Sequence, residues 1–137
     1  MAFIDKTDLL NYVRQNKLDD ITDFDDTKLD AACEDMEEYV KGYLSARYDV
    51  DAIFTATGTA RNPVIKMYMC DLVLYHLHKL INWRKIPEFR KERYQEAKEW
   101  LQDVQAGLIN PPTLLLPTDG SLDYIIFGGN PKLGNNY

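Results

Sequence analysis

The sequence has few of the residues that build disulfide-bonded, metal-binding or membrane-spanning proteins. Its 137 residues include only 2 Cys and 2 His. No stretch approaches the about 18 apolar residues of a membrane span, and the N-terminus lacks the basic and apolar regions of a signal peptide. We therefore expect a cytoplasmic compartment without a membrane partner. Cys33 and Cys70 both fall in apolar helical patterns and are expected to be free, buried thiols.

Clusters of basic residues are also missing. The formal net charge is −6, and the acidic residues are concentrated in the first 60 positions. Tight binding to a phosphate backbone requires a basic surface, so nucleic acid is disfavoured as the main ligand, although an acidic protein can still line a path for DNA. With 45% hydrophobic and 28% charged residues the composition is that of an ordinary globular domain.

The spacing of apolar residues predicts a mainly α-helical fold, a small bundle of four helices followed by an extended arm or β-hairpin. The first helix is short and is capped by Thr7 or Asp8. The Asp-rich segment 17–27 is expected to be a loop that Ile21 and Phe24 anchor to the core.

The second predicted helix runs from Thr27 to Tyr48. Its apolar residues recur at spacings of three and four, which predicts one buried face: Leu29, Ala32, Cys33, Met36, Tyr39, Val40, Tyr43, Leu44 and Tyr48. Its other face is acidic, with Asp30, Glu34, Glu37 and Glu38, and is solvated or turned toward a partner. Segment 49–61, which contains Gly58, is expected to be a loop.

Two further helices follow. Asn62 and Pro63 form a start signal for a helix that extends to about Trp83 and is apolar on most of its circumference, so it must be central or must pack against neighbouring subunits. Pro87 opens the last helix and Gly107 ends it. The predicted apolar stripe of that helix is Phe89, Tyr94, Ala97, Trp100, Leu101 and Val104.

The domain organisation expected from these patterns is a helical domain of residues 1–107 and a C-terminal arm of residues 108–137. Asp119-Gly120 separates two apolar runs of the arm, which suggests a hairpin or an extended segment. An arm this apolar needs a partner surface. The residues expected to make the contact are Leu114, Leu115, Leu116, Tyr124, Ile125, Ile126, Phe127 and Tyr137.

No pattern of catalytic or metal-binding residues has the required spacing. His76 and His78 are two positions apart on a helix, so they point to different sides and cannot chelate one ion. Asp71 could orient His78, more plausibly as a structural hydrogen bond than as a catalytic dyad. The Asp-rich loop superficially resembles a calcium loop, but Lys28 occupies the position that demands Gly. We expect no enzyme activity, no cofactor and no metal.

The second and third helices also resemble a known family. The run KLDAACEDMEEYVKGYLSARYDV, with Tyr43-Leu44 and then Arg47-Tyr48 at its end, is followed by a loop, Asn62-Pro63 and a helix that carries Cys70-Asp71-Leu72 and Tyr75. Over about residues 5 to 105 this pattern is similar to small head-to-tail connector proteins, also called adaptor or head-completion proteins, of tailed bacteriophages and Mu-like prophages. The C-terminal arm departs from the family pattern.

The resemblance implies a structural virion protein at the neck of the particle, assembled in the host cytoplasm. It implies a homo-oligomeric ring, twelvefold, that docks under the portal protein, receives a neck or tail-completion protein and conducts DNA without binding it specifically. The acidic face of Asp30, Glu34, Glu37 and Glu38 would suit the lumen, because repulsion keeps the duplex from sticking. The arm would insert into the portal or a neighbouring subunit.

Two other classes of function stay open from the residues. A helical DNA-binding or regulatory module would need a basic recognition helix, and the candidate, segment 84–98, mixes its six bases with three acids: Arg84, Lys85, Arg90, Lys91, Arg93 and Lys98 against Glu88, Glu92 and Glu96. A small enzyme would depend on a site formed by Asp71 and His78.

Overall fold

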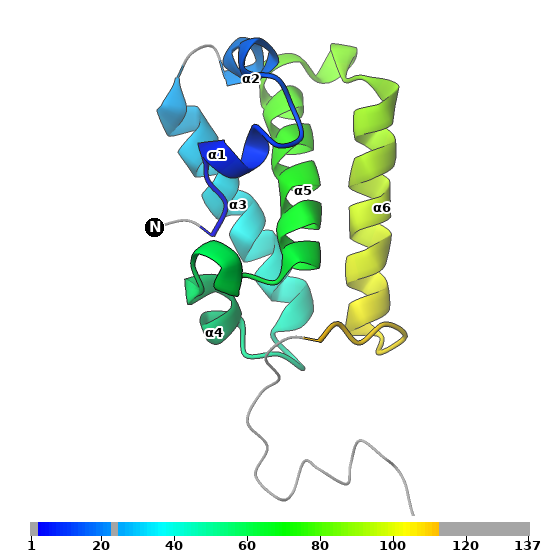
Figure 1. Ribbon diagram of the computed structural model, residues 1–137. Helices are drawn as coiled ribbons and strands as arrows, with labels where there is room; N and C mark the ends of the chain where they lie inside the picture. Colours follow the sequence, from blue (N-terminus) through cyan, green and yellow to red (C-terminus); the bar gives the residue numbers. More distant parts are fainter. Residues whose placement is uncertain (1–2, 23–24, 113–137) are drawn as a thin grey trace, which may run out of the picture.

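The fold is mainly α-helical, as the sequence predicts. A computed structural model describes residues 3–22 and 25–112, the side chains of residues 81–83 excepted (Figure 1). That part of the chain contains no strand, and none of its helices is long and apolar enough to cross a membrane. The helices are α1 (Lys6–Leu9), α2 (Gln15–Thr22), α3 (Asp26–Leu44), α4 (Val50–Thr55), α5 (Pro63–Asn82) and α6 (Glu88–Gln105), with short 3-10 turns at Gly58–Ala60 and Trp83–Lys85.

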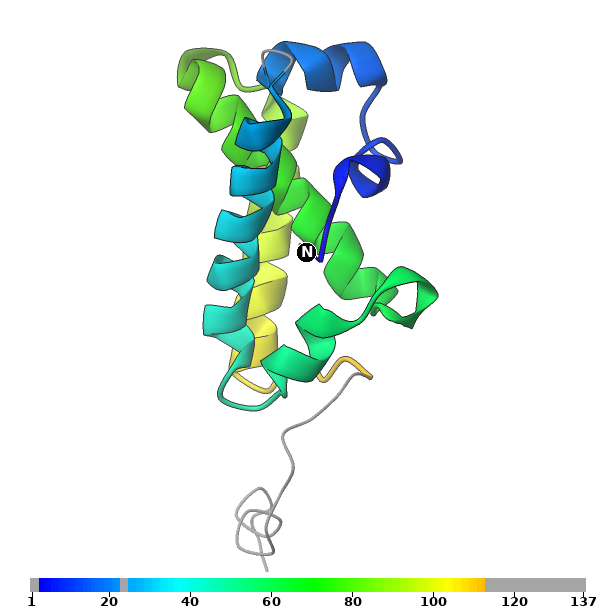
Figure 2. The ribbon, with the colours of Figure 1, turned by 90° about the vertical axis from the view of Figure 1, so that its left-hand side faces the viewer.

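Helix α5 is the centre of the bundle. It packs against α3 and α6 along its length and is also contacted by α1 and α2. The short helices α1 and α4 lie on the same side of the bundle, where α1 contacts α5 and α4 contacts α3 (Figures 1 and 2). An apolar helix is therefore covered within a single chain, which is one of the two alternatives that the sequence allows. The residues of α5 buried in this way are Ile65, Met69, Cys70, Leu72, Val73, Leu74 and Leu77, whereas Val64 and Leu80 stay exposed.

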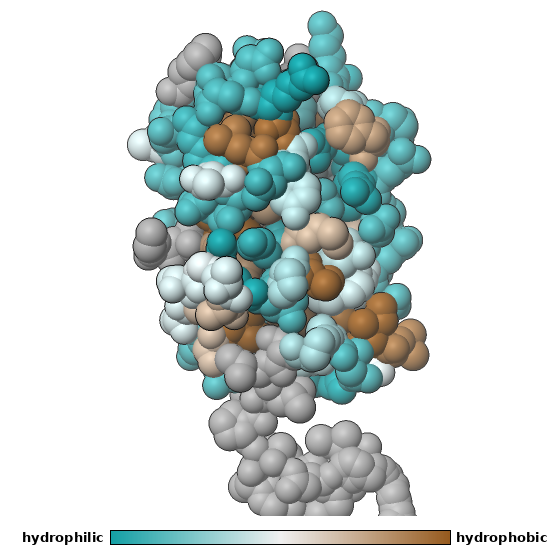
Figure 3. Space-filling view, in the orientation of Figure 1, coloured by the Kyte–Doolittle hydropathy of each residue, from teal (hydrophilic) through white to brown (hydrophobic). Residues whose placement is uncertain are grey.

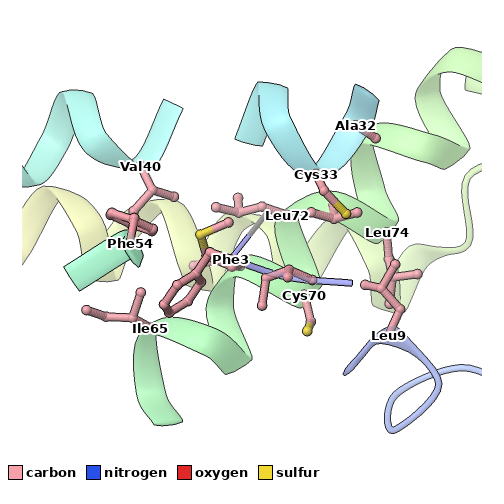
Figure 4. Packing of buried hydrophobic residues seen from close by; sticks show 14 of the residues in the cluster. Phe3, Leu9, Ala32, Cys33, Val40, Phe54, Ile65, Cys70, Leu72 and Leu74 are labelled. Carbon is pink, nitrogen blue, oxygen red and sulfur yellow. The ribbon is translucent and has the colours of Figure 1, made fainter. Parts of the chain in front are cut away.

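The core that surrounds α5 draws on every described α-helix. Figure 4 shows Val40 of α3, Phe54 of α4 and Ile65 of α5 gathered at one end of the cluster. Phe3 reaches the same region and meets Phe54 edge to face, with ring centroids 4.9 Å apart. Both cysteines are free and buried, as expected, and burial raises the pKa of the Cys33 thiol to about 12.

Stacked aromatic rings join α5 to α6. Tyr75 and Tyr94 are stacked with centroids 4.1 Å apart, and Tyr68 lies 4.9 Å from Trp100 in a tilted arrangement. Such pairs stabilise a helix interface beyond the area that they bury. Four large aromatic residues therefore pack against each other within one protomer.

The prediction of a loop over segment 17–27 is wrong for most of its length, because Gln15–Thr22 forms α2. Leu18, Ile21 and Thr22 are buried at helical spacing, and the Thr22 hydroxyl donates to the Leu18 carbonyl at 2.9 Å. Burial against α5 outweighs the weak helix propensity of the Asp residues. Ile21 anchors the segment as expected, and Phe24 lies outside the described residues.

The loop predicted over 49–61 also contains a helix. Asp49 caps α4 by accepting from the backbone N–H of Ala52 at 3.1 Å, and Ile53 and Phe54 are buried. The short first helix is confirmed, but its cap is Asp5 rather than Thr7 or Asp8. The Asp5 carboxylate accepts from the Asp8 N–H and the Asp8 carboxylate accepts from the Asp5 N–H, both at 3.0 Å, which is a capping box made of two aspartates.

The last helix ends as the sequence predicts, at Gly107, which adopts a φ of +83°. The N–H of Gly107 donates to Val104 O and that of Leu108 to Asp103 O, the paired bonds of a Schellman motif. Arg47 binds the same turn: its Nη1 donates to Val104 O at 3.1 Å and its Nη2 to Asn110 Oδ1 at 2.7 Å. Arg47, three residues after the end of α3, thus joins that end of α3 to the C-terminal turn of α6.

One buried ion pair fixes the N-terminal segment to the turn before α5. Arg61 donates to the two carboxylate oxygens of Asp8 at 2.6 and 3.0 Å, and to Phe3 O at 2.8 Å. The two side chains are only 13% and 8% exposed. Burial raises the pKa of Asp8, but the hydrogen bonds from Arg61 and Asp5 and the charge of Arg61 outweigh it, so the pKa lies below its usual value.

We expect Arg61→Gln to lower the free energy of unfolding by roughly 3 kcal/mol, because it leaves the Asp8 carboxylate buried without its counter-charge. The stabilisation from this pair is present above the ordinary Asp pKa of 3.8 and is lost as the pH falls through the lowered value. Chemical denaturation at pH 7, followed by circular dichroism, measures this change in the free energy of unfolding. Lys6→Gln is the control, since the Lys6–Asp26 pair is exposed and its loss should cost less than about 1 kcal/mol. Equal effects of the two substitutions would contradict the assignment.

Candidate functional site

The acidic face predicted on α3 is present, but only part of it is free. Asp30, Glu34 and Glu38 are exposed and recur every four residues, so they form one row along the helix. Glu37 is different. Its carboxylate accepts the backbone N–H of Phe3 at 3.0 Å and pairs with Lys41 at 3.2 Å, and its side chain is 17% exposed.

The negative charge of this row is least compensated by nearby cations at the N-terminal end of the row. Lys41 also approaches Glu38 at 3.2 Å, so one cation is shared between two glutamates. Within the described part of the chain, neither Asp30 nor Glu34 has an ion-pair partner. The row is therefore a negatively charged surface that can repel a passing polyanion, and it has no geometry for binding one.

The two histidines occupy different environments, as their spacing predicts. His76 Nε2 lies 3.2 Å from Asp35 Oδ2 of α3. His78 is buried, and burial together with the charges of Arg90 and Lys17 lowers its pKa. No group of three or more potential metal ligands exists among the residues that the structure describes.

A buried polar cluster lies between α5 and α6. Asp71 faces Arg90 with Oδ1 and Nη1 3.9 Å apart, and these side chains are 5% and 6% exposed. Burial raises the pKa of Asp71, and the charges of Arg93 and Arg90 oppose it. The expected contact between Asp71 and His78 does not form, because Arg90 reaches over from the first turn of α6 and takes that carboxylate as its counter-ion.

The residues of the apparent calcium loop are used in helix capping. Asp25 accepts from the Thr27 backbone N–H at 2.9 Å and from the Thr27 hydroxyl, and α3 begins at Asp26. Lys28 lies within the first turn of α3, so the loop geometry that calcium requires is not available there. Asp23 lies outside the described residues.

The residues expected to contact a partner from the arm are not placed. Leu114, Leu115, Leu116, Tyr124, Ile125, Ile126, Phe127 and Tyr137 all lie outside the described residues. The described residues after α6 run along the bundle: Ile109 packs against the core, Pro111 is buried, and Asn62 Nδ2 lies 3.5 Å from Pro112 O. The domain boundary at residue 107 stays a prediction.

Sequence reasoning missed a hollow between the α1–α2 connection and the start of α6. Phe89 was expected in the core stripe of α6, which is wrong: its side chain is 56% exposed. It lines a hollow of about 620 Å³ together with Leu10, Tyr12, Val13, Arg14, Lys17 and Arg90. No signal in the sequence pairs residues this far apart, because the hollow exists only after α5 has brought both segments to one end of the bundle.

Comparison with known proteins gives one family. Residues 3–114 match the model of a family described as "Bacteriophage Mu, Gp36". The match spans more than half of the chain and includes all of the described residues. No curated protein matches the chain.

The burial of His78 makes stability depend on pH. Because its pKa is lowered in the folded chain, the unfolded chain binds a proton more readily, so stability falls as the pH decreases from about 6.5 through the lowered pKa. We expect His78→Gln to reduce the drop in Tm between pH 7.5 and 5.5, measured by thermal unfolding. His76, whose side chain is 14% exposed and lies beside the exposed Asp35, is replaced by Gln as the control. An unchanged drop in the His78 variant would show that other groups cause it.

Proposed function

The chain belongs to the Bacteriophage Mu, Gp36 family, and on this premise we propose that it is a structural virion protein that joins head to tail. In this role copies of the chain form a ring under the portal protein. The ring receives the next neck or tail component and lets DNA pass through its lumen. The work is done by binding surfaces and not by catalysis, and it requires no cofactor.

The observation that carries the proposal is that large apolar side chains remain on the surface of the described part of the chain. They come from the α1–α2 connection, α5, α6 and the residues after it, which places them on several parts of the bundle. Scattered apolar residues are ordinary, but side chains this large over several elements suit a subunit with several neighbours. They are Leu10, Tyr12, Val64, Leu80, Phe89 and Leu108.

The acidic row of Asp30, Glu34 and Glu38 supports a lumen-facing position for α3. A duplex carries a dense negative charge, and a conduit that attracted it would hold it in place. A row of carboxylates without compensating cations at Asp30 and Glu34 repels the phosphates and lets the duplex slide.

The alternative, a DNA-binding module, depends on free basic residues in segment 84–98, and two of these residues are engaged in ion pairs. Of the six bases in segment 84–98, Arg90 is buried and faces Asp71. Arg93 lies 3.8 Å from Glu96 on the exposed face. A recognition helix needs its basic residues free on one face, and α6 does not present them in that way.

Electron microscopy of the portal protein of the same phage, mixed with an excess of this chain, tests the proposed role directly. We expect an additional ring of density below the portal, with the portal alone as the control. Absence of that ring at saturating concentration would contradict the proposal. The free chain can remain monomeric without bearing on it, because a portal can serve as the template for ring assembly.

A gel shift with random duplex at low salt separates the connector from the DNA-binding alternative. We expect no tight binding by the native chain. Replacing Asp30, Glu34 and Glu38 together by Lys should produce salt-sensitive binding, because it converts the acidic row into a basic one. Tight, salt-sensitive binding by the native chain would contradict the connector proposal.

A further inference from the structure

The hollow beside α6 combines exposed apolar surface with positive charge. Leu10, Tyr12 and Phe89 are 37%, 40% and 56% exposed, although each is large enough to belong in a core. They line the hollow where the α1–α2 connection meets the first turn of α6. Figure 3 shows hydrophobic atoms over this side of the molecule, surrounded by hydrophilic ones.

Three cations line the same hollow, and none of its lining residues is acidic; the charge of Arg90 is already compensated by Asp71 behind it, which leaves those of Arg14 and Lys17. Arg14 and Lys17 are exposed. Arg90 is buried at the edge of the hollow, with its guanidinium 4.8 Å from the centre of the Phe89 ring. Its Nη2 donates to Tyr12 O at 3.2 Å, but its Nε has no hydrogen-bond partner. In a chain of net charge −6 this is a local site for a ligand that is both apolar and acidic.

A segment with that chemistry is present in the same sequence. Residues 119–127 read DGSLDYIIF, which places Asp119 and Asp123 beside four consecutive apolar or aromatic residues. We infer that the hollow binds this segment from a second copy of the chain, with Tyr124 to Phe127 on the apolar surface and the two carboxylates near the cations. The inference rests on the proposed function, because it names the contact that would join one ring subunit to the next.

The position of the hollow favours a second copy over the chain's own segment. Residue 112, the last that the structure describes, lies at the opposite end of the bundle from the first turn of α6 (Figure 1). Helix α6 has 18 residues and is about 27 Å long, whereas residues 113–118 span at most about 20 Å. The run 124–127 could reach the hollow of its own chain only with most of residues 113–123 extended along α6, whereas a neighbouring copy can present the run without that extension. A contact from one end of a copy to the other end of the next is heterologous, the type that closes into rings.

Disulfide trapping in the full chain tests the contact, because the native Cys33 and Cys70 are buried and burial raises the pKa of both thiols. One chain carries Phe89→Cys and another, enlarged by a tag, carries Ile125→Cys. Phe89 is exposed, so its replacement leaves the core intact. Under mild oxidation we expect the mixed dimer to form about tenfold faster than with Gln102→Cys, an exposed control position on α6.

Charge reversal supplies the second arm of the test. Arg14→Glu with Lys17→Glu in the Phe89→Cys chain should slow the reaction about tenfold. Asp119→Lys with Asp123→Lys in the Ile125→Cys chain should then restore it. Rescue would show that the carboxylates meet these cations in the neighbouring copy.

Equal rates at Phe89→Cys and Gln102→Cys would overturn the inference, as would a double variant, Phe89→Cys with Ile125→Cys, that links only within one chain. Neither result would bear on the ring that we expect under the portal in electron microscopy. Conversely, trapping between copies with no ring at the portal would remove the connector role and keep the contact.

Discussion

The whole fold depends on keeping helix α5 out of water. Ile65, Met69, Leu72, Val73 and Leu77 face several directions around one helix, so no single neighbour can cover them. Helices α3 and α6 cover two sides and the N-terminal helices cover a third. Each covering segment then has to be held in place, which explains why Arg61 binds both Asp8 and Phe3 O, and why Glu37 accepts the Phe3 N–H.

The same constraint creates the polar features of the interior. Asp71 lies on α5 among apolar residues, so its carboxylate is carried into the core and its charge must be compensated there. Arg90 provides the compensation from α6 and also donates to the Tyr12 carbonyl. The wall of the hollow is thus connected to a buried charge, and Phe89, the neighbour of Arg90, is turned outward.

The long helices were predictable because each carries a strong periodic signal. Leu29 to Leu44 repeat at three and four, Asn62-Pro63 marks a start, and Gly107 marks an end that requires a positive φ. The short helices were not predictable in this way. Leu18 and Ile21 become buried only because α5 lies beneath them, and the Asp residues around them favour a loop in isolation. The hollow depends on contacts between residues about 75 positions apart, which no local pattern encodes, and the arm residues lie outside the described part.

The hydrogen bonds of Arg47 determine how the bundle would resist a force applied through the residues after α6. A force applied at residue 112 meets the contact of Pro112 O with Asn62 and then Asn110, which is held by Arg47, three residues after the end of α3. Load therefore passes across to α3, and the Schellman turn at Gly107 is shielded from being peeled open one hydrogen bond at a time. Residues 110 to 112 are thus held to the ends of two long helices, so they can be displaced only if contacts to both helices break together.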